Sequence, residues 1–262
     1  DLYTSERSNA GTSIVARSKK TLFADIVNRA ADAGYDEADL RSMVKSFSPT
    51  GPLFDRWYKS IEKGNPDYGV YSEPIYFAEA YGCWLEYSRG YIQAISKTGI
   101  ADELSDVDVV VDLGCGLGLT TAGLAQAFPN AQVYGTNIEG SIQYDVACSL
   151  AKDYGFKIVQ DVSKIPKSKK ILVFASEYFE HWQNPIEHLS EVMQTLDPDA
   201  FIIANTFTGD GIGHFPTYID SNKAIDRESI GRVFGQRMRD GGYEATWKGW
   251  NNKPKLWKKH EG

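Results

Sequence analysis

Cysteine, histidine and long apolar runs are all scarce in this chain of 262 residues. It has 3 cysteines, none in a Cys-x-x-Cys pair, which argues against a disulfide framework or a structural zinc site and predicts a reducing, cytoplasmic compartment. The longest unbroken apolar runs, such as residues 171–175, are far shorter than the ~20 residues that span a bilayer, so we expect no membrane span. No signal-peptide pattern is present, but the chain begins at Asp1 rather than Met, so a removed leader stays an open alternative.

Positive charge is also in the minority. The 28 Lys and Arg residues against 35 Asp and Glu residues give a formal net charge of −7. This balance argues against nucleic-acid binding over the whole surface and leaves a local basic patch as the alternative. The 42% of hydrophobic residues are enough for a buried core, which excludes global disorder, and the length fits one large α/β domain or two small ones.

The first hundred residues predict a tail followed by helices. Residues 1–20 are polar and without periodicity, which predicts a mobile tail. Apolar residues then recur at helical spacing, with breakers at 48–52 and 65–69. We therefore expect a helical cap or lid over residues 21–104. Its helices are predicted at about 22–30, 36–47, 53–63 and 74–96.

From residue 107 the pattern changes to short β-branched runs that alternate with helical stretches. This alternation is typical of βαβ units, so we expect an α/β domain whose parallel sheet is covered by helices on both faces. A helix is expected from Asn184, which can cap it ahead of Pro185, and another over about 221–240. The predicted strands lie at 109–113, 132–135, 156–159, 171–175 and 201–204, with two closing strands near 243–248 and 254–258.

A glycine-rich loop between the first predicted strand and a helix is the strongest chemical signal. Gly114, Gly116 and Gly118 follow the strand, and Asp112 stands two residues before the first glycine. Glycines at such a position let the backbone turn tightly and approach a ligand closely. The spacing is G-x-G-x-G rather than G-x-G-x-x-G, because residue 119 is leucine. For this loop taken alone, an ordinary strand-to-helix turn and a dinucleotide site are the alternatives.

The loop resembles motif I of the class I methyltransferases that use S-adenosylmethionine (SAM), and the resemblance covers about residues 105–260. It implies a Rossmann-like, seven-stranded, mostly parallel sheet, with residues 105–262 as the SAM-binding domain. After its second strand, the family carries an acid that binds the ribose hydroxyls. In this chain Asn137 stands at that position, and Glu139 is a possible substitute. Asp161 matches the family's acid that accepts a hydrogen bond from the adenine amine. The cofactor-binding residues implied in this way are Asp112, Gly114, Cys115, Gly116, Gly118, Asn137, Ile138, Asp161, Val162, Ser176 and Glu177.

Two glutamates and a histidine follow the fourth predicted strand. Glu177, Glu180 and His181 stand at i, i+3 and i+4, so one helical turn would place them on one face. Two carboxylates and an imidazole that converge there predict a site for a divalent cation, Mg²⁺ or Mn²⁺. The alternative is that the Glu-His pair only fixes the loop and the helix that follows it.

The E-x-x-E-H string of these residues resembles the metal motif of two groups of O-methyltransferases, which act on the 2′-hydroxyl of small RNAs and on ubiquinone precursors. The resemblance implies Mg²⁺ that holds neighbouring hydroxyls and lowers their pKa, with Glu177, Glu180, His181 and His214 as ligands. His214 stands after the fifth strand, and packing of its loop or contact with the substrate is its alternative role. Without metal, His181 or His214 is the candidate general base, so the predicted catalytic residues are His181, His214 and Glu180.

Aromatic residues are dense between residues 57 and 91 and again near the C-terminus. The first group predicts a lid that shapes the acceptor pocket, in which Arg89 or a tyrosine binds the SAM carboxylate; helix packing is the alternative. Residues 247–262 hold five lysines among aromatic residues. One interpretation is that these lysines and aromatic residues contact nucleic acid. The preferred interpretation is that the segment is a closing strand whose lysines face solvent.

These patterns predict a SAM-dependent methyltransferase that O-methylates a hydroxyl of a small molecule or nucleotide with the help of a divalent cation. A metal-free enzyme that uses histidine or simple proximity is one alternative. A SAM-binding sensor or structural subunit without transfer activity is another, since Asn137 departs from the family pattern. The sequence predicts no oligomeric state.

Overall fold

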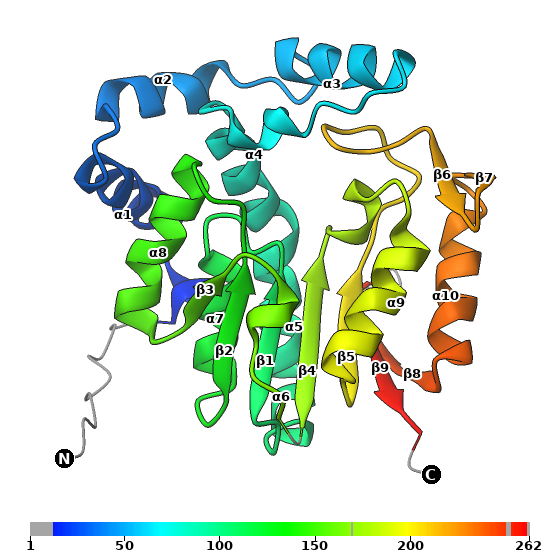
Figure 1. Ribbon diagram of the computed structural model, residues 1–262. Helices are drawn as coiled ribbons and strands as arrows, with labels where there is room; N and C mark the ends of the chain where they lie inside the picture. The colour runs from blue at the N-terminus through cyan, green and yellow to red at the C-terminus, as the bar shows by residue number, and fades with distance from the viewer. Residues whose placement is uncertain (1–12, 169, 250–252, 261–262) are drawn as a thin grey trace.

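The computed structural model describes residues 13–168, 170–249 and 253–260, and its centre is a seven-stranded sheet (Figure 1). The strand order is β3-β2-β1-β4-β5-β9-β8, and the pairs among the first five strands are parallel, whereas β9 is antiparallel to both β5 and β8. The predicted α/β fold with a mostly parallel sheet is therefore confirmed. The strands are β1 (Val109–Leu113), β2 (Gln132–Thr136), β3 (Lys157–Val159), β4 (Ile171–Ser176), β5 (Ala200–Ala204), β8 (Tyr243–Lys248) and β9 (Lys255–Lys259).

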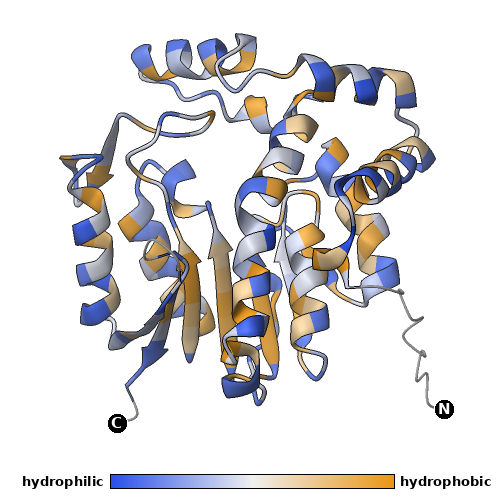
Figure 2. Ribbon diagram, turned by 180° about the vertical axis from the view of Figure 1, so that it is seen from behind, coloured by the Kyte–Doolittle hydropathy of each residue, from blue (hydrophilic) through white to orange (hydrophobic). Residues whose placement is uncertain are grey.

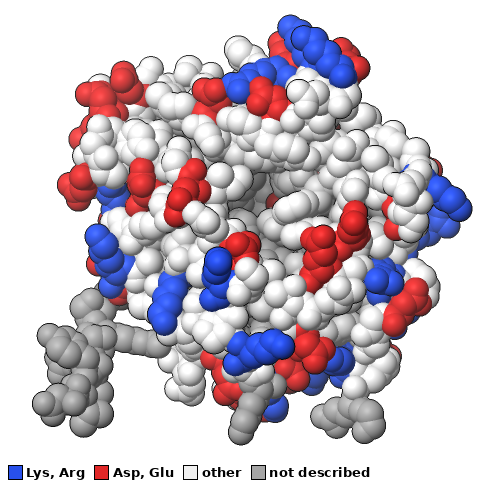
Figure 3. All heavy atoms as spheres, viewed as in Figure 1, with Lys and Arg blue, Asp and Glu red and all other residues white. Residues whose placement is uncertain are grey.

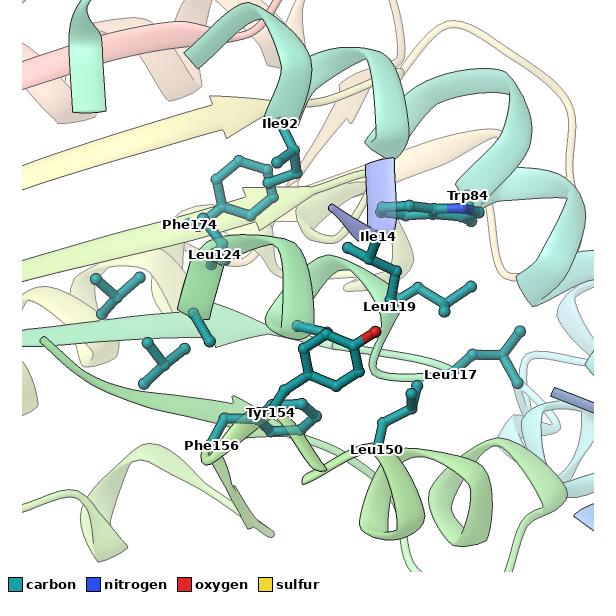
Figure 4. Packing of buried hydrophobic residues seen from close by; sticks show 14 of the residues in the cluster. Ile14, Trp84, Ile92, Leu117, Leu119, Leu124, Leu150, Tyr154, Phe156 and Phe174 are labelled. Atoms are coloured by element: carbon teal, nitrogen blue, oxygen red, sulfur yellow. The ribbon is translucent and has the colours of Figure 1, made fainter. Parts of the chain in front are cut away.

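Helices cover both faces of the sheet, and the alternation of side chains along the central strands separates two apolar clusters. In β4, Leu172 and Phe174 belong to one cluster, and Ile171 and Val173 belong to the other. Figure 2 shows the apolar strands between the helices, and Figure 4 shows the packing of the first cluster. The covering helices are α5 (Arg89–Lys97), α6 (Ile100–Glu103), α7 (Leu119–Ala127), α8 (Ile142–Tyr154), α9 (Pro185–Leu196) and α10 (Ile230–Asp240).

The helices predicted before residue 100 are present, and several of them cross above the carboxyl ends of the strands (Figure 1). The long helix expected over 74–96 contains a π-helical segment, η3 (Trp84–Ser88), between α4 and α5. Such segments are rare and occur mainly as single turns at functional sites, and the apolar spacing does not reveal one. The other elements are η1 (Ile14–Ala16), α1 (Lys19–Asp32), α2 (Glu37–Ser46), α3 (Pro52–Glu62), η2 (Tyr68–Ser72) and α4 (Tyr76–Cys83).

The mobile tail predicted over residues 1–20 is wrong for residues 13–20, while residues 1–12 lie outside the described part of the chain. Ile14 is fully buried, and its amide donates to Gln126 Oε1 of α7 at 2.9 Å. Figure 4 shows Ile14 between Trp84 and Leu119. A single buried isoleucine in a polar segment gives no periodic signal, which is why the pattern did not predict this packing.

The last predicted helix is also wrong over its first half. Residues 217–226 form a two-stranded antiparallel hairpin, β6 (Thr217–Asp220) and β7 (Lys223–Asp226), and the helix begins only at Ile230. The two turn residues, Ser221 and Asn222, have φ of +50° and +63°. Positive φ at both central residues is the geometry of the tight hairpin turn, and Ser-Asn is a weaker signal for it than Asn-Gly.

Candidate functional site

The glycine loop lies at the carboxyl end of β1, where its three glycines have φ of +67°, +51° and +79°. A Cβ at Gly114 would lie 2.5 Å from the Tyr178 ring, and one at Gly118 would lie 2.9 Å from the Cα of Ala147 in α8. At Gly116 the nearest atom to such a Cβ is 3.9 Å away. Gly114 and Gly118 therefore permit close packing, whereas no protein atom crowds the space beside the Cα of Gly116.

Two residues predicted to bind the cofactor lie beneath this loop. Asp112 is buried and accepts a hydrogen bond from the Thr121 hydroxyl at 2.7 Å, and burial raises the pKa of its carboxyl to about 7. Cys115 is buried against Gly135 of β2. The geometry gives both residues a supporting position under the loop, and direct contact with the cofactor stays a prediction.

The ends of β2 and β3 lie beside the glycine loop. Asn137 Nδ2 donates to the carbonyl of Gly116 at 2.8 Å, and Asn137 Oδ1 accepts from the amide of Ile138 at 2.9 Å. The Ile138 side chain is 54% exposed, which offers an apolar surface next to these polar groups. Asp161 precedes η4 (Val162–Lys164), and the Ser163 hydroxyl holds the pKa of its carboxyl below the ordinary value. One Asp161 oxygen accepts from the Ser163 amide at 2.8 Å, which leaves the other for a ligand.

After β4 the chain turns sharply, and the predicted helical turn is wrong at its start. Glu177 has φ of +48° and lies before the 3₁₀ turn η5 (Phe179–His181). Glu177 Oε1 accepts from the Tyr91 hydroxyl at 3.0 Å. Ser176, at the strand end, lies 2.9 Å from the Ser88 hydroxyl. Glu177 therefore faces the helix α5 instead of continuing one helical face with Glu180 and His181.

Glu180 is fully buried behind this turn. Its Oε1 accepts from the amide of Thr206 at 2.7 Å, and its Oε2 has no hydrogen-bond partner within the described residues. Burial and the neighbouring carboxylate of Glu177 raise the pKa of Glu180 well above its usual value. An unsatisfied carboxylate oxygen in the interior is costly, which makes it a candidate contact for a bound ligand.

The two predicted histidines meet at the ends of β4 and β5. Their rings are nearly perpendicular, with centroids 5.0 Å apart. His181 Nδ1 lies 2.9 Å from the Tyr71 hydroxyl, and burial lowers the His181 pKa to about 3. His214 Nδ1 donates to the carbonyl of Gly209 at 2.9 Å, and burial also lowers the His214 pKa. Both imidazoles are therefore neutral at pH 7.

The predicted metal ligands do not form an ion site in the described part of the chain. Within residues 13–168, 170–249 and 253–260, no group of three or more His, Cys, Asp or Glu side chains is close enough to hold an ion. The turn at Glu177 breaks the predicted helical face, although its carboxylate stays close enough to Glu180 to raise the pKa of that residue.

Some residues in the site were not singled out by sequence reasoning, and Tyr71 was predicted only as one of the aromatic residues of the lid. Tyr71 belongs to η2 and joins His181, and the side-chain amide of Gln143 in α8 donates to the Tyr71 carbonyl. Asn205 follows β5, and its Oδ1 is buried without a partner among the described residues. No motif distinguishes these residues, but the carboxyl end of β5 is where ligands bind in such sheets, which could have directed attention to Asn205.

Arg89 and the C-terminal lysines have local partners. Arg89 Nε donates to the carbonyl of Val15 at 2.8 Å, so a role toward the SAM carboxylate stays a prediction. Lys258 pairs with Glu103, and residues 255–259 form β9, as the closing-strand interpretation predicted. Trp250 lies outside the described residues. In the part of the chain that the structure describes, no helix is long and apolar enough to cross a bilayer.

Residues 111–204 match the sequence profile of the family described as a methyltransferase domain. The match begins within β1, ends with β5, and includes the glycine loop and the Glu-His turn. Over these residues the chain is similar to the methyltransferase domain of that family. The predicted enzyme class, a methyltransferase, is confirmed by this match, and SAM binding at the strand ends described above stays a prediction.

Solved structures share the fold at low sequence identity. The mitomycin 7-O-methyltransferase is 12% identical, with a TM-score of 0.50, and the match covers 93% of this chain and 75% of that one. Magnesium protoporphyrin IX methyltransferase from Synechocystis PCC 6803, with bound S-adenosylhomocysteine (SAH), is 17% identical with a TM-score of 0.46, covering 86% of this chain and 100% of that one. These similarities concern the methyltransferase fold.

Replacing Asp161 with alanine is expected to weaken SAM binding about tenfold, because the adenine amine would lose its acceptor. Calorimetric titration with SAM measures this. Asp226→Ala is the matched control, since Asp226 also accepts from a nearby backbone amide, that of Ser229 at 2.7 Å, but belongs to the separate hairpin β6–β7 and not to the seven-stranded sheet. Equal SAM affinities for the two variants would place the adenine elsewhere.

Proposed function

We propose that this methyltransferase transfers the methyl group of SAM to a hydroxyl oxygen of a small-molecule acceptor, with His214 as the general base. The observation that carries the proposal is the fixed tautomer of His214. Its Nδ1 donates to the Gly209 carbonyl, so Nε2 is the unprotonated nitrogen and can accept a proton. The lowered pKa keeps this accepting form dominant at neutral pH.

His181 is the weaker candidate for the base. Its pKa near 3 makes it a poor proton acceptor at pH 7, and its Nδ1 already lies against the Tyr71 hydroxyl. We assign His181 a positioning role, since its ring packs against that of His214 and fixes one side of the loop that carries it.

In the proposed step, the acceptor oxygen attacks the methyl carbon in line with the sulfonium. The new C–O bond forms as the C–S bond breaks, the electron pair goes to sulfur, and the hydroxyl proton goes to His214 Nε2. The glycine loop, Asn137 and Asp161 would hold SAM so that its methyl faces the ends of β4 and β5. Figure 3 shows a hollow between the helices that cross the strand ends and the sheet, and we propose residues 21–104 as the lid over it.

Activation of the acceptor hydroxyl by a divalent cation is the second candidate mechanism. In each predicted ligand, one atom makes a hydrogen bond within the protein and a second atom is available to bind the ion. Glu180 binds Thr206 through Oε1, His181 meets Tyr71 through Nδ1, and the unpartnered Glu180 Oε2 suits a cation. Partners of this kind orient metal ligands. Mg²⁺ or Mn²⁺ held by Glu177, Glu180, His181 and His214 would lower the pKa of an acceptor hydroxyl. The described side chains would have to move together to bind it.

The test uses SAM labelled in its methyl group and a panel of phenols, alcohols, nucleosides, amines and thiols, first in excess EDTA and then with Mg²⁺ or Mn²⁺. We expect label in an alkali-stable methyl ether, already formed in EDTA. Transfer only after addition of metal, lost in Glu180→Gln, would establish the second candidate instead. Label on nitrogen or sulfur would refute O-methylation, and SAM binding without turnover would favour the sensor alternative.

A further inference from the structure

Four carboxylates gather where the helix α4–η3–α5 meets the turn after β4. Glu79 and Glu86 lie four residues before and three after Cys83, on one face of that helix. Burial raises the pKa of the half-buried Cys83 thiol, and Glu79 and Glu86, together with Glu177 and Glu180 across from them, raise it further. We call Glu79, Glu86, Glu177 and Glu180, with Tyr76, Tyr87 and Tyr91, the acidic–tyrosine cluster.

No cation of the described residues forms a salt bridge with these four carboxylates. Arg89, on the same helix, donates to the Val15 carbonyl instead. Lys253 donates to the Thr206 hydroxyl. Burial raises the pKa of Glu79, and the carboxylate of Glu86 raises it further. The cluster therefore holds four acidic side chains without a salt-bridge partner among the described residues, and burial favours the neutral forms of Glu79 and Glu180 unless a cation binds beside them.

Two buried acceptors at the strand ends also lack a donor among the described residues. Glu180 Oε2 is one, in a side chain with no exposed surface. Asn205 Oδ1 is the other. Ser176 of β4 pairs with Ala204 of β5, so Glu177 and Asn205 are the next residues of two adjacent strands. What is missing at this point is a group that donates hydrogen bonds and carries positive charge.

The tyrosines of the cluster fit a charged organic group better than a metal ion. The Tyr91 hydroxyl donates to Glu177, and burial raises the pKa of Tyr76, Tyr87 and Tyr91, so all three are neutral phenols. The electron-rich faces of such rings attract ammonium groups. A metal ion would need converging oxygen and nitrogen ligands, and the described side chains do not converge in that way.

We propose that the acceptor is a basic small molecule whose protonated amine binds in the acidic–tyrosine cluster between Glu79 and Glu177, while its hydroxyl lies near His214. This inference rests on the proposed O-methyl transfer. SAM itself carries an ammonium, a sulfonium and a carboxylate, so its single net positive charge balances only part of the cluster. The acceptor amine supplies further positive charge and the missing donors for Glu180 and Asn205.

The test measures binding without turnover, in the full chain saturated with SAH. Three phenols that differ in charge are titrated calorimetrically: tyramine (cation), 4-ethylphenol (neutral) and 4-hydroxyphenylacetate (anion). We expect tyramine to bind at least about tenfold more tightly than 4-ethylphenol, and the anion to bind most weakly. Equal affinities, a preference for the anion or no detectable tyramine binding would overturn the proposal.

Variants locate the effect. Glu79→Gln should remove most of the preference for tyramine, and Glu62→Gln, the same change on an exposed position of α3, should leave it intact. Glu86→Gln, at an exposed position of the cluster, gives the same test if Glu79→Gln does not fold. Unchanged tyramine preference in the cluster variants would overturn the proposal. So would a Glu79→Gln protein that binds SAM less well but SAH normally, because the carboxylate would then serve the sulfonium.

Discussion

Substitution of His214 by asparagine is expected to lower kcat for methyl transfer by about 10²–10⁴-fold, the usual contribution of a general base. Asparagine Nδ2 can take over the hydrogen bond that His214 Nδ1 donates to Gly209, so the loop keeps this contact. What is lost is Nε2, the only ring nitrogen that can accept the proton of the acceptor hydroxyl. SAM affinity, measured by calorimetry, should be unchanged, because the hydrogen bond of the His214 side chain goes to Gly209 and not to the glycine loop.

The pH profile of the wild-type enzyme provides an independent test. The proton-accepting form of His214 is the neutral one, so kcat rises with pH through its pKa and then reaches a plateau. Burial lowers that pKa, so the rise should be complete at a lower pH than for a free imidazole, whose pKa is about 6.5. His260→Asn, at a position whose side chain is 62% exposed, is the matched control. A full-rate His214→Asn enzyme would disprove the assignment.

Replacement of Gly118 by alanine is expected to lower the free energy of unfolding by about 2–5 kcal/mol. A non-glycine residue in the left-handed region costs about 1–2 kcal/mol, and overpacking against a neighbouring backbone costs about 1–3 kcal/mol more. The added Cβ would lie 2.9 Å from the Cα of Ala147, so α8 itself has to shift. Urea denaturation measures the change, provided that the slope against urea concentration stays the same.

Gly99 is the matched control for this substitution. It precedes α6 just as Gly118 precedes α7, and its φ of +78° is almost the same as the +79° of Gly118. No atom lies within 4 Å of a Cβ built at Gly99. Gly99→Ala should therefore lower the free energy of unfolding only by the cost of the left-handed backbone, about 1–2 kcal/mol. Equal losses in the two variants would show that packing against α8 is not what requires glycine at position 118.

The parts of the fold that were predicted from sequence are those with strong local signals. The strands around Val109–Leu113 and Ile171–Ser176 are buried on both faces and read as continuous apolar runs. The glycine loop has the spacing G-x-G-x-G, which is typical of only a few folds. In contrast, the π-helical segment at Trp84–Ser88 and the hairpin at 217–226 depend on backbone geometry that apolar spacing does not encode.

The candidate site was predicted less completely, because its residues come from distant parts of the chain. Sequence spacing placed Glu177, Glu180 and His181 on one helical face, but the positive φ of Glu177 breaks that face. The partners that set the chemistry, Tyr71 for His181 and Gly209 for His214, are tertiary contacts without a motif. Spacing along the chain therefore brought these residues forward as candidates and could not give their geometry.

The short turn η1 at the start of the described chain contacts two helices that lead to different parts of the site. Ile14 packs against α7, the helix that begins at the glycine loop, and the Val15 carbonyl receives Arg89 from α5, the helix that carries Tyr91. The turn at 14–16 thus connects α7, which begins at the glycine loop, with α5, which carries Tyr91. Substitutions at residues 14–16 are therefore expected to change the affinities for SAM and for the acceptor together, although none of these residues lines the site.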